Sequence, residues 1–391
     1  YPPFRVAKPG DELVMVQVVW RHGDRAPTMT YPTDEHKEDA WPNGWGELTE
    51  LGMRQQYALG RILHSRYING TYSFISPRYN SKEIYIRSTD VNRTLISAYA
   101  NIAGLFSEGV PGEDFPDYIR WPSHWTPVPV HTMDADTDYE GNVFAFCPRA
   151  DEITEKLRES LEYRRLGKEY SGLLSFLSEK SGMEVDLANA YLINDVRYIE
   201  SLYNMTQPEW FTPDIAAKLI NLTRATNEFT YGIGKPYSPE LIKLRGGSLL
   251  KSMNDKFRQK ISCRTENKPG CEWISPLKYY AYSAHDTTVS ALLSTFGDER
   301  RVIRGGLPHY TASVAIELWK LQDVGYAVKL LFHGAFHHNY HTITHLTKGC
   351  PINNEYCPFK MFETRSAKFE PSDISSECKK KHLMRTSNRI I

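Results

Sequence analysis

The sequence predicts an α/β domain that is interrupted by a helical insertion. Near both ends of the chain, short apolar runs that are typical of strands alternate with amphipathic segments of helix length. Between these parts, residues 152–261 show an almost wholly helical pattern without strand-like alternation. Because alternating strands and helices are typical of parallel sheets, we expect residues 1–111 and 266–391 to form the α/β core. Residues 112–265 then form a mainly helical cap.

The first elements belong to the amino-terminal core segment. The continuous apolar, β-branched run from Leu13 to Trp20 predicts a buried strand of a parallel sheet. Apolar residues near helical spacing predict a helix over roughly 49–68, and Thr49 is a candidate N-cap residue. A short strand over 83–87 precedes a second helix, which we expect to start at a Thr89-Asp90 cap and to end near Phe106.

The remaining elements divide between the cap and the second core segment. Repeated prolines between residues 111 and 148 predict an irregular stretch. Ser238-Pro239 is typical of a helix start, with a capping side chain followed by proline in the first turn. The second core segment is expected to contain a helix at 287–296 and strands at 278–283, 312–321 and 326–332.

Charge and hydropathy exclude two classes of protein. The 391 residues include 47 Lys+Arg and 47 Asp+Glu, so the formal net charge is zero. A general nucleic-acid binder usually carries a basic excess, and we therefore expect no nucleic-acid partner. The longest strongly apolar run, Leu13 to Trp20, is much shorter than the about 20 residues of a membrane helix. We therefore expect no membrane span.

Six cysteines and four glycosylation sequons favour an oxidising environment. The absence of a Cys-x-x-Cys pair argues against a zinc knuckle or a thioredoxin-type site. The sequons begin at Asn69, Asn92, Asn204 and Asn221. Together with the even number of cysteines they indicate the secretory pathway, so we expect a secreted or lysosomal protein.

The strongest local feature is the string Arg21-His22-Gly23-Asp24-Arg25-Ala26-Pro27, directly after the first predicted strand. Ligands of open α/β sheets bind beyond the carboxyl ends of the strands. The planar guanidinium groups of Arg21 and Arg25 pair bidentately with phosphate oxygens, so they can form a cradle for a tetrahedral oxyanion. The imidazole of His22 can then attack phosphorus and hold the phosphoryl group covalently. The alternative is a basic turn solvated at the surface.

Two further segments place candidate groups at strand ends. Arg87 precedes a helix N-terminus, where a third cation and the positive end of the helix would deepen an anion site. His285 and Asp286 follow the predicted strand 278–283. His285 can donate to a phosphate oxygen, and Asp286 can protonate a leaving alcohol. Taken alone, each segment has a structural alternative, namely an ion-paired arginine or a helix-capping aspartate.

The chain resembles the histidine acid phosphatases, a branch of the histidine phosphatase superfamily. Besides the first motif, the resemblance is carried by Gly44-x-Gly46-x-Leu48-Thr49-x-Leu51-Gly52, Arg87-Ser88-Thr89-Asp90 and His285-Asp286-Thr287-Thr288. The match keeps the order of the family and spans roughly Leu13 to Cys378. It implies a three-layer α/β sandwich with a mostly parallel central sheet and an inserted helical cap.

The resemblance also implies an acid phosphatase that hydrolyses small phosphate monoesters. His22 would form a phosphohistidine, and Asp286 would protonate the leaving group and then activate water. The groups that would bind the phosphoryl oxygens are Arg21, Arg25, Arg87 and His285. The family needs no metal or other cofactor, and homodimers are common among its animal members. Because Asp286 must be protonated and the arginines should keep His22 unprotonated, we expect an acidic pH optimum.

The disulfide pairing is a hypothesis that rests on the same resemblance. Cys147 with Cys378, and Cys350 with Cys357, resemble bridges of the family, although the second loop is wider than expected. Cys263 and Cys271 are only eight positions apart, whereas the vertebrate enzymes bridge a longer span in the cap.

One sequon departs from the pattern of the family. Asn92 stands where aspartate is more usual, and a glycan there would crowd Arg87. We therefore expect the sequon at Asn92 to be unused and take Asn69, Asn204 and Asn221 as the glycosylation candidates.

A histidine-rich stretch near the end of the core invites a metal-site interpretation. It contains His333, His337, His338, His341 and His345. No His-Glu-x-x-His motif is present, and the spacing does not place one ligand set on one helix. We expect a strand followed by a polar loop and no metal site.

Other functions remain open at this point. A phytase-like or otherwise specialised phosphomonoesterase would carry the same motifs, because substrate choice lies in the cap. A non-catalytic phosphate- or glycan-binding module would keep the arginines but show no turnover. A phosphotransfer mutase is a further alternative, and the His-Asp pair argues against it.

Overall fold

The computed structural model describes residues 7–70, 72–266, 268–303, 307–335 and 338–380. Its centre is a seven-stranded sheet in the order β2-β3-β1-β4-β5-β6, with β7 paired to β5. The strands are β1 (Glu12–Arg21), β2 (Ile84–Ser88), β3 (Tyr279–Ala284), β4 (Ser313–Leu321), β5 (Gly325–His333), β6 (His341–Thr342) and β7 (Cys357–Pro358). The sheet is mixed, because β2, β3 and β1 are parallel while the remaining pairs are antiparallel.

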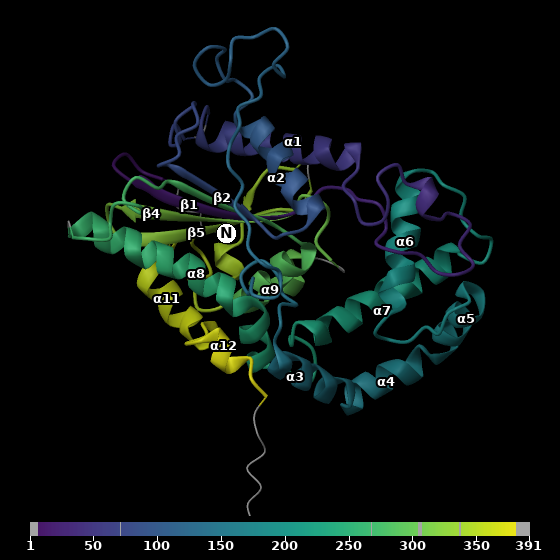
Figure 1. The fold of residues 1–391 in the computed structure, drawn as a ribbon. Helices are drawn as coiled ribbons and strands as arrows, with labels where there is room; N and C mark the ends of the chain where they lie inside the picture. Colours follow the sequence, from purple (N-terminus) through teal and green to yellow (C-terminus); the bar gives the residue numbers. More distant parts are fainter. Residues whose placement is uncertain (1–6, 71, 267, 304–306, 336–337, 381–391) are drawn as a thin grey trace, which may run out of the picture.

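Helices cover both faces of the sheet and complete three layers (Figure 1). One layer contains α1 (Glu50–Tyr67) and α2 (Asn92–Leu105), and the other contains α8 (Pro239–Thr265), α9 (Asp286–Phe296) and α11 (Phe359–Ser366). Successive side chains of a strand point to opposite faces, and β1 uses both. Val18 packs in the cluster of α1 and α2, whereas Val19 packs in the cluster of α8 and α9. The predicted α/β sandwich is confirmed.

A group of helices lies beside the sheet and forms the cap, on the right in Figure 1. These helices are α3 (Pro148–Arg158), α4 (Leu161–Glu169), α5 (Ser171–Ser181), α6 (Ala190–Leu202) and α7 (Pro213–Thr230). The cap has an apolar cluster of its own, to which Leu177, Ile193 and Leu219 belong. The remaining short elements are α10 (Glu299–Val302), α12 (Ile374–Glu377) and three 3₁₀ turns at Glu38–Ala40, Thr344–Leu346 and Ala367–Phe369.

Helix α8 lies within the predicted cap range but packs as a layer of the core. Leu249, Met253 and Phe257 belong to the cluster that covers the sheet. The expected boundary between cap and core at residue 265 therefore lies too far along the chain. A helical pattern predicts the helix but does not reveal the surface on which it packs.

Two of the three predicted helix starts agree with the structure. The hydroxyl of Thr49 accepts a hydrogen bond from the N–H of Gly52, and Ser238 accepts one from the N–H of Leu241. The predicted Thr89-Asp90 cap is wrong, because α2 begins at Asn92 with Val91 as its N-cap residue. The Thr89 hydroxyl instead contacts Thr94 and the ring of His285.

The six cysteines form three disulfides, in the pairs of the hypothesis that was based on the family resemblance. They are Cys147–Cys378, Cys263–Cys271 and Cys350–Cys357. The first joins the start of the cap to the end of α12, 231 positions apart. Within the described residues, no helix combines the length and the hydropathy that a membrane crossing requires.

Two glycines allow α1 to lie directly against the loop that follows β1. A Cβ atom on Gly52 would lie 2.1 Å from the carbonyl oxygen of Asp24, and one on Gly23 would lie 2.2 Å from the carbonyl oxygen of Gly52. Both contacts are with backbone atoms, so no side chain can turn away to relieve them. The loop that carries His22 is therefore held by a close backbone approach that only glycine permits.

We expect Gly52→Ala to lower the free energy of unfolding by about 1–3 kcal/mol, because the added methyl must push α1 away from the loop. Gly172→Ala in α5 is the matched control, since no atom lies within 4 Å of its new Cβ. This control should be neutral or stabilise the protein by up to about 1 kcal/mol. Chemical denaturation measures both variants, and an unchanged stability of Gly52→Ala would contradict the prediction.

Candidate active site

The motif that contains His22 and the motif that contains His285 and Asp286 meet at the carboxyl ends of β1 and β3. These strands are parallel neighbours, and Arg21 pairs with Ala284 in their register. The backbone N–H of His22 donates to the carbonyl oxygen of Ala284 at 3.0 Å. The rings of His22 and His285 are 5.8 Å apart between centroids and nearly perpendicular. The fold thus brings together groups that lie more than 260 positions apart in the sequence.

His22 is buried and neutral. Its Nδ1 lies 2.8 Å from the carbonyl oxygen of Gly23. Because a carbonyl oxygen only accepts hydrogen bonds, Nδ1 carries the proton and Nε2 keeps its lone pair. Burial, followed by the charges of Arg21 and Arg93, holds the pKa of His22 well below its usual value. The Nε2 atom therefore keeps its lone pair in acid solution.

Arg21 and Arg25 are fixed on either side by acidic partners. Nη2 of Arg21 lies 3.0 Å from Oδ2 of Asp286. Arg25 binds Asp195 with both terminal nitrogens, at 3.0 and 3.2 Å. The ring of Tyr310 packs against Arg21, with its centroid 4.2 Å from the guanidinium carbon. The Nε atoms of both arginines are buried without a hydrogen-bond partner, so each leaves a donor that an anion could satisfy.

Asp286 is ionised in the ligand-free site. Burial alone would raise its pKa, but the charges of Arg21 and Arg25 outweigh burial and hold the pKa below its ordinary value. The Oδ1 atom accepts a hydrogen bond from the N–H of Thr287 at 2.7 Å. A proton on this carboxylate must therefore arrive with the ligand or follow the neutralisation of the arginines.

His285 is the fourth group that faces this cluster. Burial, followed by the charge of Arg93, lowers its pKa to about 4, although Asp286 opposes the shift. Its Nε2 lies 2.9 Å from Oγ1 of Thr89, which holds the ring in place. His285 is therefore a neutral imidazole at most pH values.

The structure places Arg93, rather than the predicted Arg87, beside the two histidines. Arg87 is held by Asp138 at 2.5 Å and by Glu140 at 3.0 Å. Arg93 is the charge with the largest effect on the pKa of His285. Burial, followed by Arg25, lowers the pKa of Arg93 itself to about 10, and its Nε is buried without a partner.

A different signal in the sequence could have indicated Arg93. The prediction relied on Arg87, the last residue of the predicted strand 83–87, which in the structure is still part of β2. Arg93 instead stands in the first turn of α2, whose N-terminus faces the carboxyl edge of the strands. The start of this helix was expected at Thr89-Asp90, so Arg93 was not considered as a residue of the first turn.

The cap contributes residues from α6 that no local motif revealed. Asp195 holds Arg25, and Tyr198 lies against Tyr310 with ring centroids 6.5 Å apart. Tyr203, just after α6, donates a hydrogen bond to Oδ2 of the buried Asp24. These contacts join the cap to the loop that contains His22, so α6 lies next to the site.

The described part of the chain contains no group of three or more His, Cys, Asp or Glu side chains arranged to hold a metal ion. His333 lies at the end of β5, and its Nδ1 is 3.1 Å from the carbonyl oxygen of Thr311. His337, also part of the histidine-rich stretch, lies outside the described residues.

Comparisons with known proteins agree with this geometry. The chain is 31% identical to the lysosomal acid phosphatase of Xenopus laevis, over 97% of this chain and 82% of the relative. It is 34% identical to the prostatic acid phosphatase of Homo sapiens, over 94% of this chain and 88% of the relative. A solved structure of Hafnia alvei phytase in complex with myo-inositol hexakis sulphate is similar in fold, with a TM-score of 0.66 and 15% identity. That likeness covers 96% of this chain and 100% of the phytase chain.

The model of the histidine phosphatase superfamily (branch 2) matches residues 12–333, which include the whole cluster around His22. A family match over most of the chain, relatives above 30% identity and the arrangement of the two histidines point to the same assignment. The chain therefore belongs to branch 2 of the histidine phosphatase superfamily.

Proposed function

We propose that this chain is an acid phosphatase that hydrolyses phosphate monoesters through a phosphohistidine on His22. The observation that carries the proposal is a neutral, buried imidazole with a free Nε2 among three arginines whose Nε atoms lack partners. Phosphoryl transfer depends mainly on positioning and on charge stabilisation, and this cluster supplies both. The named relatives, which are acid phosphatases, support the same activity.

In the proposed reaction, Nε2 of His22 attacks phosphorus, and the bond from phosphorus to the ester oxygen breaks. Asp286 gives a proton to that oxygen, so the alcohol leaves in neutral form. Water then attacks phosphorus, Asp286 takes up a proton from it, and the bond between phosphorus and His22 breaks. Inorganic phosphate leaves and the starting enzyme is restored. The phosphoryl oxygens are bound by Arg21, Arg25, Arg93 and His285.

The proton for the leaving group comes with the substrate in this scheme. Asp286 is ionised in the free site, because Arg21 and Arg25 lower its pKa. A phosphate monoanion carries one proton, and its negative charge offsets the arginines, so the proton can pass to Asp286. The acidic optimum then reflects the ionisation of the substrate rather than that of the free carboxyl group.

We expect kcat/KM for p-nitrophenyl phosphate to be highest below about pH 6 and to fall roughly tenfold per pH unit above it, because the second ionisation of a phosphate monoester has a pKa of about 6. The assay uses EDTA throughout and a second substrate with a higher phosphate pKa. The falling limb should move to higher pH with the second substrate. A limb fixed at one pH for both substrates, or a maximum above neutral pH, would contradict the scheme.

A phytase-like activity is the second candidate, supported by the fold shared with the Hafnia alvei phytase. A substrate with many phosphates needs several basic groups around the reacting phosphate. The face of α6 next to the site instead carries Tyr191, Asp195 and Tyr198, and none of these is basic. These three side chains favour a substrate with a single phosphate and a neutral or aromatic leaving group.

The remaining properties that we propose are cellular and quaternary. Three disulfides and exposed side chains at Asn69, Asn204 and Asn221 support passage through the secretory pathway, glycosylation at these sites, and a secreted or lysosomal location. Tyr118 and Ile119 are exposed apolar side chains, 58% and 98% accessible, and support a homodimer.

The cap, with α8 excluded, is proposed to select the substrate.

A further inference from the structure

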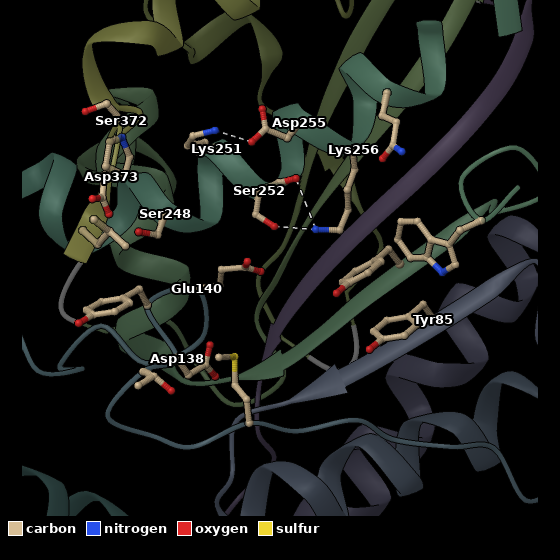
Figure 2. A pocket seen from close by; sticks show the side chains of 18 residues that line it. Tyr85, Asp138, Glu140, Ser248, Lys251, Ser252, Asp255, Lys256, Ser372 and Asp373 are labelled. Atoms are coloured by element: carbon tan, nitrogen blue, oxygen red, sulfur yellow. Dashed lines mark hydrogen bonds and ion pairs between the residues drawn. The ribbon is translucent and has the colours of Figure 1, made fainter. Parts of the chain in front are cut away.

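A cavity of about 820 Å³ lies outside the phosphate-binding cluster. It is open to solvent and is bordered by α8, by the β2–β3 edge of the sheet, and by the loops around residues 133–140 and 371–374 (Figure 2). None of the proposed catalytic groups around His22 lines it. Its volume is typical of sites for small organic ligands.

One wall of the cavity is aromatic. Tyr85 and Tyr280 are stacked with ring centroids 4.9 Å apart. Trp273 is nearly perpendicular to both rings, at 6.1 and 6.4 Å, and 46% of its surface is exposed. The faces of Tyr85 are occupied by Tyr280 and by His131, so the indole of Trp273 is the ring that a ligand can reach.

The Cys263–Cys271 disulfide fixes the segment that carries Trp273. It closes a loop between the end of α8 and the stretch before β3, and the sulfur partner Cys271 is buried. Trp273 stands two positions after this bridge. The bridge restricts the chain next to this exposed indole, which reduces the entropy cost of ordering it around a ligand.

Next to this aromatic wall, the cavity offers both donors and acceptors. Lys256 Nζ lies over the ring of Tyr280, 4.4 Å from its centroid, and donates to the hydroxyl of Ser252 at 2.6 Å. Figure 2 shows the carboxylate of Glu140 projecting between these groups and Ser248. Oγ of Ser248 has no hydrogen-bond partner, and neither has Oδ2 of Asp138. Both side chains are more than nine-tenths buried, at 8% and 0% exposed. Such buried polar atoms are costly unless a ligand or water satisfies them.

The charges around the cavity largely compensate one another. Asp138 and Glu140 are both paired with Arg87. Asp255 is paired with Lys251 at 2.5 Å and with Arg258 at 2.7 Å. An amine would therefore meet only carboxylates that are already paired, whereas a phosphate would meet Lys256, whose Nζ donates to Ser252 and has no ion pair in the described part of the chain. A neutral ligand with many hydroxyl groups fits this surface better.

We propose that this cavity binds a neutral pyranose sugar, either a single residue or the end of an oligosaccharide. A pyranose has an apolar C–H face that can lie on the exposed indole of Trp273. Its ring of hydroxyl groups both donates and accepts, so it can satisfy Glu140 and Asp138 as acceptors and Lys256 as a donor. The site is separate from the proposed phosphatase centre and does not depend on it.

The test titrates the full chain with the methyl pyranosides of glucose, mannose and N-acetylglucosamine and with their disaccharides. Binding is followed by tryptophan fluorescence and by calorimetry. We expect at least one of these neutral sugars to bind with a Kd of about 1 mM or tighter, as is ordinary for a small ligand with few contacts. Inorganic phosphate, which occupies the catalytic cluster, should not compete.

Two variants and one control locate the binding. Trp273→Ala and Lys256→Met should each weaken it by about tenfold or more, because each removes one of the contacts that the proposal assigns. Tyr57→Ala removes an exposed ring from α1, outside the cavity, and should leave the affinity unchanged. The proposal is overturned if no neutral sugar binds, if both cavity variants bind as the native chain does, or if only phosphate or spermidine occupies the cavity.

Discussion

Replacement of His22 by alanine should lower kcat for p-nitrophenyl phosphate by about 10⁵-fold or more, because the loss of a covalent nucleophile leaves only binding and charge stabilisation. The structure gives the reason in atomic terms. Nδ1 is held by the carbonyl oxygen of Gly23, so Nε2 is the one ring nitrogen with a free lone pair. Rapid acid-free quenching with a ³²P-labelled substrate should trap label on the native chain and none on His22→Ala.

The control for this experiment is His124→Ala, because His124 is exposed and lies outside the cluster. It should keep the native kcat and the native amount of label. Circular dichroism and thermal unfolding of both variants separate a loss of chemistry from a loss of folding. If folded His22→Ala still turned over or still became labelled, the nucleophile would be another group and the proposed mechanism would fail.

The sequence predicted that the motifs of His22 and Asp286 lie together, because both follow parallel strands. The apolar runs of β1 and β3 are local signals, and the carboxyl ends of neighbouring parallel strands share one edge of the sheet. His22 and Asp286 could thus be assigned to one site without any knowledge of the contacts between them. The caps at Thr49 and Ser238 were predictable for the same reason, since a cap and its helix are adjacent in sequence.

Contacts between the cap and the core could not be predicted in this way. The pair formed by Arg25 and Asp195 spans 170 positions, and the hydrogen bond from Tyr203 to Asp24 spans 179. Neither Asp195 nor Tyr203 belongs to a motif, and a helical pattern does not show which face of α6 meets the site. The role of α8 was missed for a similar reason, because its burial depends on the sheet beneath it.

The wrong prediction for the start of α2 also led to a wrong choice of the third arginine of the cluster. The Thr89-Asp90 pair resembles a helix cap, and that interpretation drew attention to Arg87 at the strand end. In the structure Thr89 supports His285 instead, and α2 starts at Asn92. Arg93 then falls in the first turn of this helix, where its charge lowers the pKa of both histidines, while Arg87 is held by two carboxylates.

We expect Arg93→Ala to lower kcat/KM for p-nitrophenyl phosphate by about 10²–10³-fold, the usual effect of removing one donor from a site that stabilises developing negative charge. Its stability should change little, because Nη1 of Arg93 makes only a long hydrogen bond of 3.4 Å to the carbonyl oxygen of Gly46, its Nε has no partner, and its charge is repelled by Arg25. Arg87→Ala should show the opposite pattern. It leaves Asp138 and Glu140 without their cation and should lower the free energy of unfolding by about 3 kcal/mol.

The two variants differ only in which arginine is lost, so the comparison tests the placement of the phosphate directly. Activity is measured as kcat/KM at a temperature where both variants are folded, and stability is measured by chemical denaturation. A larger rate loss in Arg87→Ala than in Arg93→Ala would mean that the transferring phosphate lies towards β2, as the strand-end pattern first suggested. A larger rate loss in Arg93→Ala would place it over the N-terminus of α2, where the helix dipole and the guanidinium act on the same oxygen atoms.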